Sequence, residues 1–296
     1  MQLISFLESR NLKYCRRINT ARISSIRAGG VAEFGVFPKN KRELCELISA
    51  LNSINVRFKI VGKCTNMFFP DLGYDGVLIF TSALNGISIR DTDIYAECGV
   101  GLRTLVKSAL EGELDVGAEL YGIPGSVGGA VRMNAGAFGK SISDFILEVE
   151  AFDETTEEVL RLSREELEFG YRHSLLQCKP LYVLSAKLKS ARSSREKLTE
   201  SIQRFCEKRK ASQPSAPSLG SFYKAFGDVS ASKLIDESGL KGLAFGGASV
   251  SEKHAGFIVN NGGATASDIN SLASIVEKVI MEKYSRRLVR EVEFCE

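Results

Sequence analysis

Hydrophobic residues return every three or four positions in four stretches of the chain, which is the spacing of one helix face. The stretches are 40–55, 101–111, 198–206 and 267–284. Asn40, with Glu43 three residues later, suits the start of the first helix, and Ser267 suits the start of the last. The chain also begins with an amphipathic segment that turns polar before residue 27. The pattern therefore predicts helices at these four places and a helix-like start.

Short runs of alternating or β-branched residues lie between these helices and predict strands. The predicted strands are 33–38, 57–61, 77–80, 87–89, 94–98, 146–152, 158–162, 181–189, 243–250, 256–260 and 288–294. Residues 190–194 are rich in serine, and 213–220 is rich in proline and serine, which predicts a linker and a domain boundary near residue 190. Helices and strands that mix in this way indicate an α+β fold.

Residues 122–139 contain six glycines, one proline and several apolar side chains, so they do not resemble a polar linker. Glycine lets a backbone approach a ligand closely, and a row of free N–H groups can hold a pyrophosphate. On the residues alone, a buried tight turn with glycines for close packing explains the stretch about as well. Two familiar phosphate loops are excluded, because Asn134 and Thr104 stand where the P-loop and the dinucleotide fingerprint need glycine.

Composition narrows the class of protein. The chain has 296 residues, of which 44% are hydrophobic and 25% charged, and a net charge of +3 gives no argument for nucleic acid. No apolar run reaches the roughly 18 residues of a membrane span, and the N-terminus does not resemble a signal peptide. Seven cysteines without a C-x-x-C pair, and only two histidines, indicate reduced thiols and no metal site. We therefore expect a cytoplasmic protein with no metal, membrane or nucleic-acid partner.

The stretch 122–139 resembles the flavin-diphosphate loop of the UDP-N-acetylenolpyruvoylglucosamine reductase family, whose pattern is close to G-I-P-G-[ST]-V-G-G-A-x-x-x-N-A-G-A-[YF]-G. The resemblance implies an FAD-binding fold of the vanillyl-alcohol-oxidase (PCMH) type over about 24–190, with subdomains at 1–85 and 86–190. It also implies a C-terminal α+β substrate-binding domain at 191–296. No inserted segment lies between residues 174 and 190, as in the shorter subclass of the family.

A second motif of the family, G-x-G-[ST]-N-[LI], resembles Gly62–Met67, with Cys64 in place of a glycine. Together the two motifs imply the FAD contacts. These are Gly62, Lys63, Cys64, Thr65, Asn66, Met67, Gly122, Ile123, Pro124, Gly125, Ser126, Gly128, Gly129, Asn134, Ala135 and Gly136.

Three further motifs of the family imply catalytic residues. The Y-R-x-S motif implies Arg172, which from local sequence alone is better explained by a salt bridge. The P-S-A-G-S-x-F-K-N-P motif implies Ser221 as proton donor, although turn or cap serines are commoner. The closing strand of the family carries a glutamate before a valine, which selects Glu291 over Glu293, although a strand carboxylate is more often solvent-facing.

Substrate contacts are expected from Lys224 and Arg209 at the diphosphate, and from Tyr171. Ala225 departs from the asparagine of the family, which helps to hold the nucleotide-sugar end of the substrate.

The resemblance implies an enzyme that uses FAD to pass a hydride from NADPH to UDP-N-acetylglucosamine-enolpyruvate, which gives UDP-N-acetylmuramate for peptidoglycan. We expect a monomer that acts on this small molecule. A different FAD oxidoreductase of the same fold is the second hypothesis, supported only by Ala225 and Cys64. A non-catalytic protein that binds FAD or a nucleotide sugar is the third, and it predicts loss of catalytic residues that this chain retains.

Overall fold

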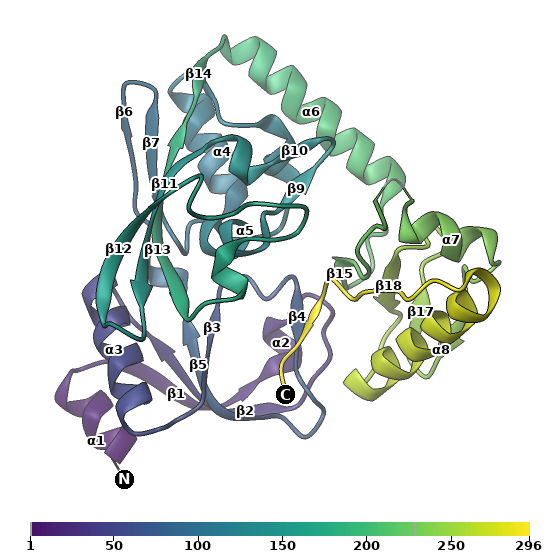
Figure 1. Ribbon diagram of the computed structural model, residues 1–296, viewed down its shortest axis with the longest axis horizontal. Helices are drawn as coiled ribbons and strands as arrows, with labels where there is room; N and C mark the ends of the chain where they lie inside the picture. Colours follow the sequence, from purple (N-terminus) through teal and green to yellow (C-terminus); the bar gives the residue numbers. More distant parts are fainter. Residues whose placement is uncertain (1, 228) are drawn as a thin grey trace. The chain divides into compact units, whose positions relative to one another are not determined.

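The computed structural model describes residues 2–227 and 229–296, and these form two compact units (Figure 1). Each unit is assembled from separate stretches of chain. The first comprises Met1–Cys15, Phe34–Lys63 and Gly76–Lys208, and the second comprises Arg16–Glu33, Cys64–Asp75 and Arg209–Glu296.

The helices include all four predicted ones and the helix-like start, together with short ones at 20–23, 127–133 and 231–237 that were not predicted. They are α1 (Gln2–Ser9), α2 (Thr20–Ile23), α3 (Lys41–Ser53), α4 (Leu102–Glu111), α5 (Val127–Met133), α6 (Arg195–Ser212), α7 (Ala231–Glu237) and α8 (Ala266–Tyr284). Asn40 caps α3 as predicted, since its side chain accepts a hydrogen bond from the Glu43 amide at 2.9 Å. The expected cap of α8 is wrong by two residues. Thr265 caps that helix in a capping box with Asp268, because each side chain accepts a hydrogen bond from the other's backbone amide.

An antiparallel sheet organises the first unit. Its strands lie in the order β12 (Glu158–Ser163), β11 (Ile146–Asp153), β13 (Leu181–Lys189), β7 (Asp93–Glu97) and β6 (Ile87–Arg90). The inward positions of β11 and β13 alternate with polar ones, as Val149 opposite Ala186 illustrates. Helices α4 and α5 contact this sheet. All five strands fall on segments where alternation predicts them.

The chain has further strands outside this sheet. They are β1 (Lys13–Asn19), β2 (Val31–Phe37), β3 (Phe58–Val61), β4 (Met67–Phe68), β5 (Tyr74–Phe80), β8 (Leu114–Asp115), β9 (Gly136–Ala137), β10 (Lys140–Ser141) and β14 (Ala191–Arg192). Strands β3 and β5 are parallel. Strand β1 was not predicted, because most of its residues are exposed and its sequence KYCRRIN has no apolar alternation.

The second unit contains a four-stranded antiparallel sheet with α8 against it (Figure 1). Its order is β15 (Ser218–Ser221), β18 (Phe257–Asn260), β17 (Ala248–Val250) and β16 (Ala244–Phe245). The single strand predicted at 243–250 is therefore a hairpin, which turns at Gly246 with φ of 54°. Part of the predicted linker at 213–220 is also strand, since β15 begins at Ser218.

The closing strand predicted at 288–294 is shorter than expected. Only β19 (Glu293–Phe294) is a strand, and it runs parallel to β4. The predicted alternation holds nonetheless, because Leu288 and Val292 are buried whereas Val289 is exposed.

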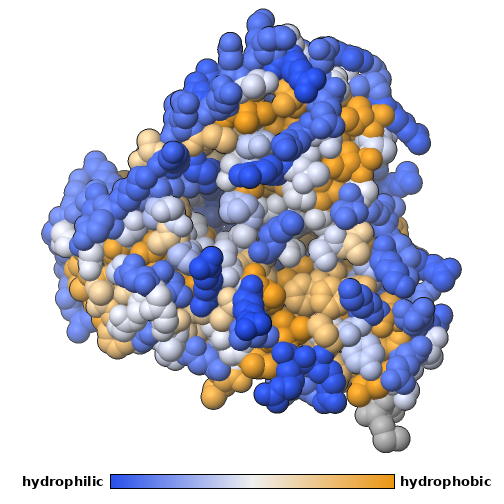
Figure 2. All heavy atoms as spheres, turned by 180° about the vertical axis from the view of Figure 1, so that it is seen from behind, coloured by the Kyte–Doolittle hydropathy of each residue, from blue (hydrophilic) through white to orange (hydrophobic). Residues whose placement is uncertain are grey.

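Each unit has its own hydrophobic core. The core of the first unit includes Leu47, Val149 and Leu188, and that of the second includes Phe222, Ile269 and Val276. Hydrophilic side chains are spread over the face in Figure 2, with hydrophobic ones between them. Of the helices in 2–227 and 229–296, none combines the length and apolar character that a membrane crossing needs.

Candidate functional site

In the first unit, the glycine-rich loop 122–129 is bound to the segment that precedes α4. The amides of Val127 and Gly128 donate to the carbonyls of Val100 and Cys98, each at 2.8 Å. In the opposite direction, the Leu102 amide donates to the Gly125 carbonyl at 2.9 Å. Helices α4 and α5 consequently begin beside each other.

The glycines of this site serve two different purposes. A Cβ atom on Gly62 would lie 2.3 Å from Ser126 Oγ, and one on Gly128 would lie 2.9 Å from Cys98 Cβ. These two glycines are therefore required by close packing, the alternative that the sequence left open. Gly125 and Gly129 differ, since a Cβ there would meet no atom nearer than 3.8 Å and 3.4 Å respectively. Packing therefore does not require glycine at these two positions.

The charge of these loops suits an anion. Neither α4 nor α5 has an acidic residue in its first turn, so the partial positive charge of both N-termini is uncompensated there. Lys63 adds a full charge, because its Cε lies 3.6 Å from the Cβ position of Gly101, the N-cap of α4. Ser126 caps α5 through a 3.4 Å hydrogen bond from the Gly129 amide. Glycine backbone, two helix N-termini and an ammonium group together fit the diphosphate of a dinucleotide such as FAD.

The end of α5 holds the segment that carries Arg172. Asn134 ends this helix in the left-handed conformation, with φ of 43°, and its Nδ2 donates to the Gly170 carbonyl at 2.8 Å. The Ser174 hydroxyl donates to the Arg132 carbonyl at 2.6 Å. The side chain of Asn134 thus joins the second half of the glycine motif to the Y-R-x-S motif.

Arg172 is half-buried and is held by the same loop. Its Nη2 donates to the Gly136 carbonyl at 3.0 Å and its Nη1 to the Asn134 carbonyl at 3.5 Å. The guanidinium also lies over the ring of the exposed Tyr171, 5.3 Å from its centroid. These two carbonyl oxygens and the Tyr171 ring fix the direction of the Arg172 guanidinium beside the second half of the glycine motif.

In the second unit, residues 64–67 lie against the closing segment of the chain. Asn66 Nδ2 donates to the Glu291 carbonyl at 3.1 Å, and the Glu293 amide donates to the Asn66 carbonyl at 2.8 Å. Cys64 has a left-handed φ of 48°, which explains why glycine suits this position in the family. Burial raises the pKa of the Cys64 thiol to about 12, so the group stays protonated and acts as a packing residue.

A β-bulge directs Ser221. The pairing of β15 with β18 shifts between Ser218 and Ser221, and Gly220 has φ of 79° at this place. Leu219 and Phe222 are buried on either side, whereas Ser221 is exposed. The bulge therefore turns the hydroxyl outward instead of into the core of this unit.

The segment after Ser221 pairs with the segment that carries Glu291. The Glu291 amide donates to the Phe222 carbonyl at 2.9 Å, and the Lys224 amide donates to the Val289 carbonyl at 2.8 Å. The predicted residues Ser221, Lys224 and Glu291 are therefore neighbours within the second unit.

The other predicted substrate residues have separate positions. Arg209, in the last turn of α6, belongs to the second unit and donates from Nη1 to Gln213 Oε1 at 2.7 Å. Tyr171 and Arg172 belong to the first unit. Sequence reasoning missed that Asn66 supports Glu291, because nothing in the sequence pairs two segments 225 residues apart.

Comparison with known proteins agrees with this geometry. Residues 32–163 match the model of an FAD binding domain, and residues 213–295 match the C-terminal domain of UDP-N-acetylenolpyruvoylglucosamine reductase. The reductase of Caldanaerobacter subterraneus subsp. tengcongensis is 39% identical over 92% of this chain and 90% of its own length. That of Latilactobacillus sakei subsp. sakei is 38% identical over 90% and 88%. The crystal structure of the Thermus caldophilus enzyme superposes with a TM-score of 0.82 at 29% identity, covering 96% of this chain and all of that one.

The FAD binding domain and the relatives that match define an FAD-dependent oxidoreductase. The chain belongs to the UDP-N-acetylenolpyruvoylglucosamine reductase family. The predicted family, α+β fold class and FAD cofactor are thereby confirmed.

Proposed function

We propose that this chain reduces UDP-N-acetylglucosamine-enolpyruvate to UDP-N-acetylmuramate, with NADPH as the reductant. The observation that carries the proposal is the pairing of Phe222 with Glu291, which makes Ser221 and Glu291 neighbours in the second unit of a chain of this family. A serine and a carboxyl group beside each other can supply and balance the proton that such a reduction needs.

Two sets of residues are proposed as FAD contacts, one in each unit. In the first unit, Gly125, Ser126, Gly129 and Lys63 suit its diphosphate. In the second unit, the predicted contacts are Cys64–Met67. The remaining predicted contacts at 122–124, 128 and 134–136 stay predictions, and Asn134 already uses its side chain to hold Gly170. When bound, FAD supplies the hydride that it has taken from NADPH.

The protein has to stabilise the negative charge that develops on the substrate and to supply a proton. When a hydride reaches the methylene carbon of the double bond, negative charge spreads onto the adjoining carboxylate of the substrate. We propose that Arg172 stabilises this charge, and that Glu291 shares a proton with it, because preorganised groups are worth several kcal/mol in such a role. One oxygen of Glu291, Oε2, is buried, and its backbone is held at both the amide and the carbonyl.

Ser221 completes the reaction in this proposal. Its hydroxyl donates a proton to the carbon beside the ether oxygen, which forms the new C–H bond and leaves the serine oxygen negatively charged. Since Ser221 is exposed, water can return that proton after the product has left. While the substrate is bound, it has to cover the serine itself, because a serine gives up its proton only to a strong base in a dry site.

The nucleotide-sugar end of the substrate is assigned to Lys224, Arg209 and Tyr171. Two cations and an exposed aromatic ring suit a diphosphate and a base.

We also infer a monomer in the cytoplasm, and the sequence-based domains 1–85, 86–190 and 191–296 stay part of the proposal. Light scattering of the purified protein would test the monomer.

The test is a turnover assay on purified protein loaded with FAD. Consumption of NADPH should depend on the enolpyruvyl substrate, and mass spectrometry should find a product heavier by two hydrogen atoms. Ser221→Ala should bind FAD normally but produce little product. If NADPH reduces the bound flavin but the substrate is never consumed, the result favours a different FAD oxidoreductase of the same fold. Ala225 is then the first position to examine.

A further inference from the structure

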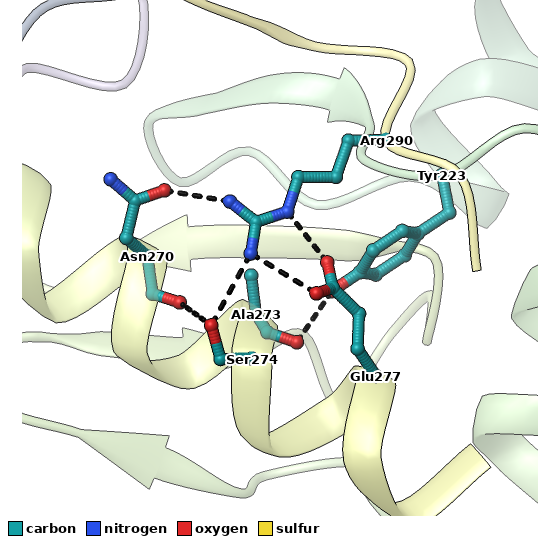
Figure 3. A network of polar contacts seen from close by, with 6 residues as sticks. All are labelled: Tyr223, Asn270, Ala273, Ser274, Glu277 and Arg290. Atoms are coloured by element: carbon teal, nitrogen blue, oxygen red, sulfur yellow. Dashed lines mark hydrogen bonds and ion pairs between the residues drawn. The ribbon is translucent and has the colours of Figure 1, made fainter. Parts of the chain in front are cut away.

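Arg290, the residue before Glu291, is fixed to helix α8 by an unusually complete set of contacts (Figure 3). Its Nε and Nη2 donate to the two carboxylate oxygens of Glu277, at 2.6 and 3.2 Å. Its Nη1 donates to Asn270 Oδ1 at 2.8 Å, and its Nη2 also lies 3.4 Å from Ser274 Oγ. The Arg290 and Glu277 side chains are only 30% and 29% exposed. A bidentate pair with further hydrogen bonds fixes direction as well as distance.

The residue opposite Arg290 is fixed to the same helix. Tyr223 and Arg290 form an isolated antiparallel bridge, and the Tyr223 hydroxyl donates to the Ala273 carbonyl at 3.0 Å. Burial, together with the nearby Glu277 carboxylate, raises the pKa of Tyr223, so the phenol remains a donor. The Tyr223 hydroxyl therefore adds a second anchor to α8. The stretch 270–277 of α8 holds both segments that carry the predicted catalytic residues.

Backbone geometry relates these anchors to Glu291. Successive side chains of an extended segment point to opposite sides. With Arg290 directed at α8, Glu291 has to leave on the other side, the side that it shares with Lys224 across the bridge. The amide of Glu291 and the carbonyl of Glu291 are also bonded, to Phe222 and Asn66. Release of Arg290 would remove the side-chain contacts to α8 and leave the direction of Glu291 to these backbone bonds.

We infer that Arg290, Glu277 and Tyr223 are positioning residues, an anchor that fixes the register of the Ser221–Lys224 segment against Glu291. The inference rests on the proposed function, because it assigns the anchor a role in the step that Ser221 and Glu291 perform. It predicts that loss of the anchor harms the transfer to substrate and spares the reduction by NADPH, in which these residues take no part.

The experiment follows the two half-reactions separately by rapid mixing of the FAD-loaded enzyme. In Arg290→Met, reduction of the flavin by NADPH should stay within about twofold of the parent rate. Reoxidation by the enolpyruvyl substrate should fall about 10- to 100-fold, the size expected for misplacing a catalytic group by about 1 Å. Arg290→Lys should recover part of the rate, because an ammonium group keeps the positive charge but cannot form the bidentate pair with Glu277.

Two further variants show whether the contacts act as one unit. Glu277→Gln should slow reoxidation as Arg290→Met does, and the double variant should be no slower than either, since both remove the same interaction. Tyr223→Phe, which removes only the hydroxyl, should cause a smaller loss and keeps the test open if Arg290→Met does not fold. The matched control is Lys278→Met, which breaks the exposed 3.9 Å pair with Glu282 on the same helix and should change neither half-reaction.

The outcomes separate the two proposals. If Arg290→Met and Tyr223→Phe reoxidise as fast as Lys278→Met, the anchor has no positioning role. If Arg290→Met slows both half-reactions equally or loses FAD, its role is general stability and the inference is wrong. If the parent enzyme is reduced by NADPH but never reoxidised by the substrate, the proposed function is wrong. The positioning role, which rests on it, is then wrong as well.

Discussion

Two neighbouring glycines of α5 provide a sharp test of the phosphate loop. Gly128 and Gly129 both lie in the first turn of the helix, so alanine at either should gain about 1 kcal/mol of helix propensity. Their surroundings differ. A Cβ on Gly128 would lie 2.9 Å from Cys98 Cβ and 3.2 Å from the Cys98 carbonyl oxygen, whereas one on Gly129 would meet only Ser126 Oγ, at 3.4 Å.

The two alanine variants should therefore change stability with opposite signs. Overpacking against Cys98 costs about 1–3 kcal/mol, and since Cys98 is buried the strain cannot relax into solvent. Gly128→Ala should thus lose about 1 kcal/mol net, and Gly129→Ala should gain up to about 1 kcal/mol. Urea unfolding of the FAD-free protein measures both.

FAD binding should distinguish the two variants in the opposite way, because the variant expected to be more stable, Gly129→Ala, should bind FAD more weakly. Gly129 is exposed, and a methyl group there would meet the diphosphate that we place against this backbone. We expect Gly129→Ala to weaken FAD binding by about 10- to 100-fold, the equivalent of about 1–3 kcal/mol. Gly128→Ala should bind FAD nearly as the parent does. A fluorescence titration with FAD measures this, and normal binding by Gly129→Ala would refute the loop as a phosphate site.

Three further predictions concern the second unit. Asp71 accepts hydrogen bonds from the Ala266 and Ser267 amides and the Ser267 hydroxyl at 2.6–2.9 Å. Asp71→Asn should therefore lower the free energy of unfolding by about 1 kcal/mol, measured by urea denaturation. An unchanged midpoint would show that Thr265 alone caps α8. Although burial acts to raise the pKa of Asp71, these hydrogen bonds lower it below its usual 3.8, so its stabilisation is complete above that value and disappears as the pH falls through the folded pKa. The parent should therefore lose stability more steeply than Asp71→Asn below about pH 4. Cys64→Gly relieves the strain of a left-handed φ but removes a buried side chain, so the melting temperature should change little. The variant should bind FAD at least as well as the parent. Weaker FAD binding would show that the cysteine has a positive role.

The motifs in the sequence were sufficient to predict the family and the FAD-binding fold, because glycine and catalytic motifs are local and specific. Gly62 and Gly128 show where local reasoning stopped. Both belong to predicted cofactor motifs, yet each faces a protein side chain, Ser126 or Cys98, that only the fold brings near. Packing and ligand approach favour the same residue type, so the sequence alone could not separate them.

Other misses have similarly physical reasons. Ser267 and Thr265 are equally good caps by residue type, and the choice is made by Asp71, which lies 195 residues away from Ala266 and occupies the amides of Ala266 and Ser267. The closing segment looks like a long strand because its residues alternate. Its pairing changes partner along the segment, however, because Arg290 forms an isolated bridge with Tyr223 and β19 then pairs with β4. In the predicted strand 243–250, the Gly246-Gly247 pair was a turn signal that alternation had hidden.

The most direct measurement is an anaerobic absorbance titration of the FAD-loaded protein, carried out on the parent and on Ser221→Ala. The account predicts that NADPH bleaches the flavin band of both, and that UDP-N-acetylglucosamine-enolpyruvate restores it promptly in the parent and only slowly in the variant. A parent protein that stays bleached would contradict the proposed reaction, and a Ser221→Ala protein that recovers as fast as the parent would contradict the role given to this serine.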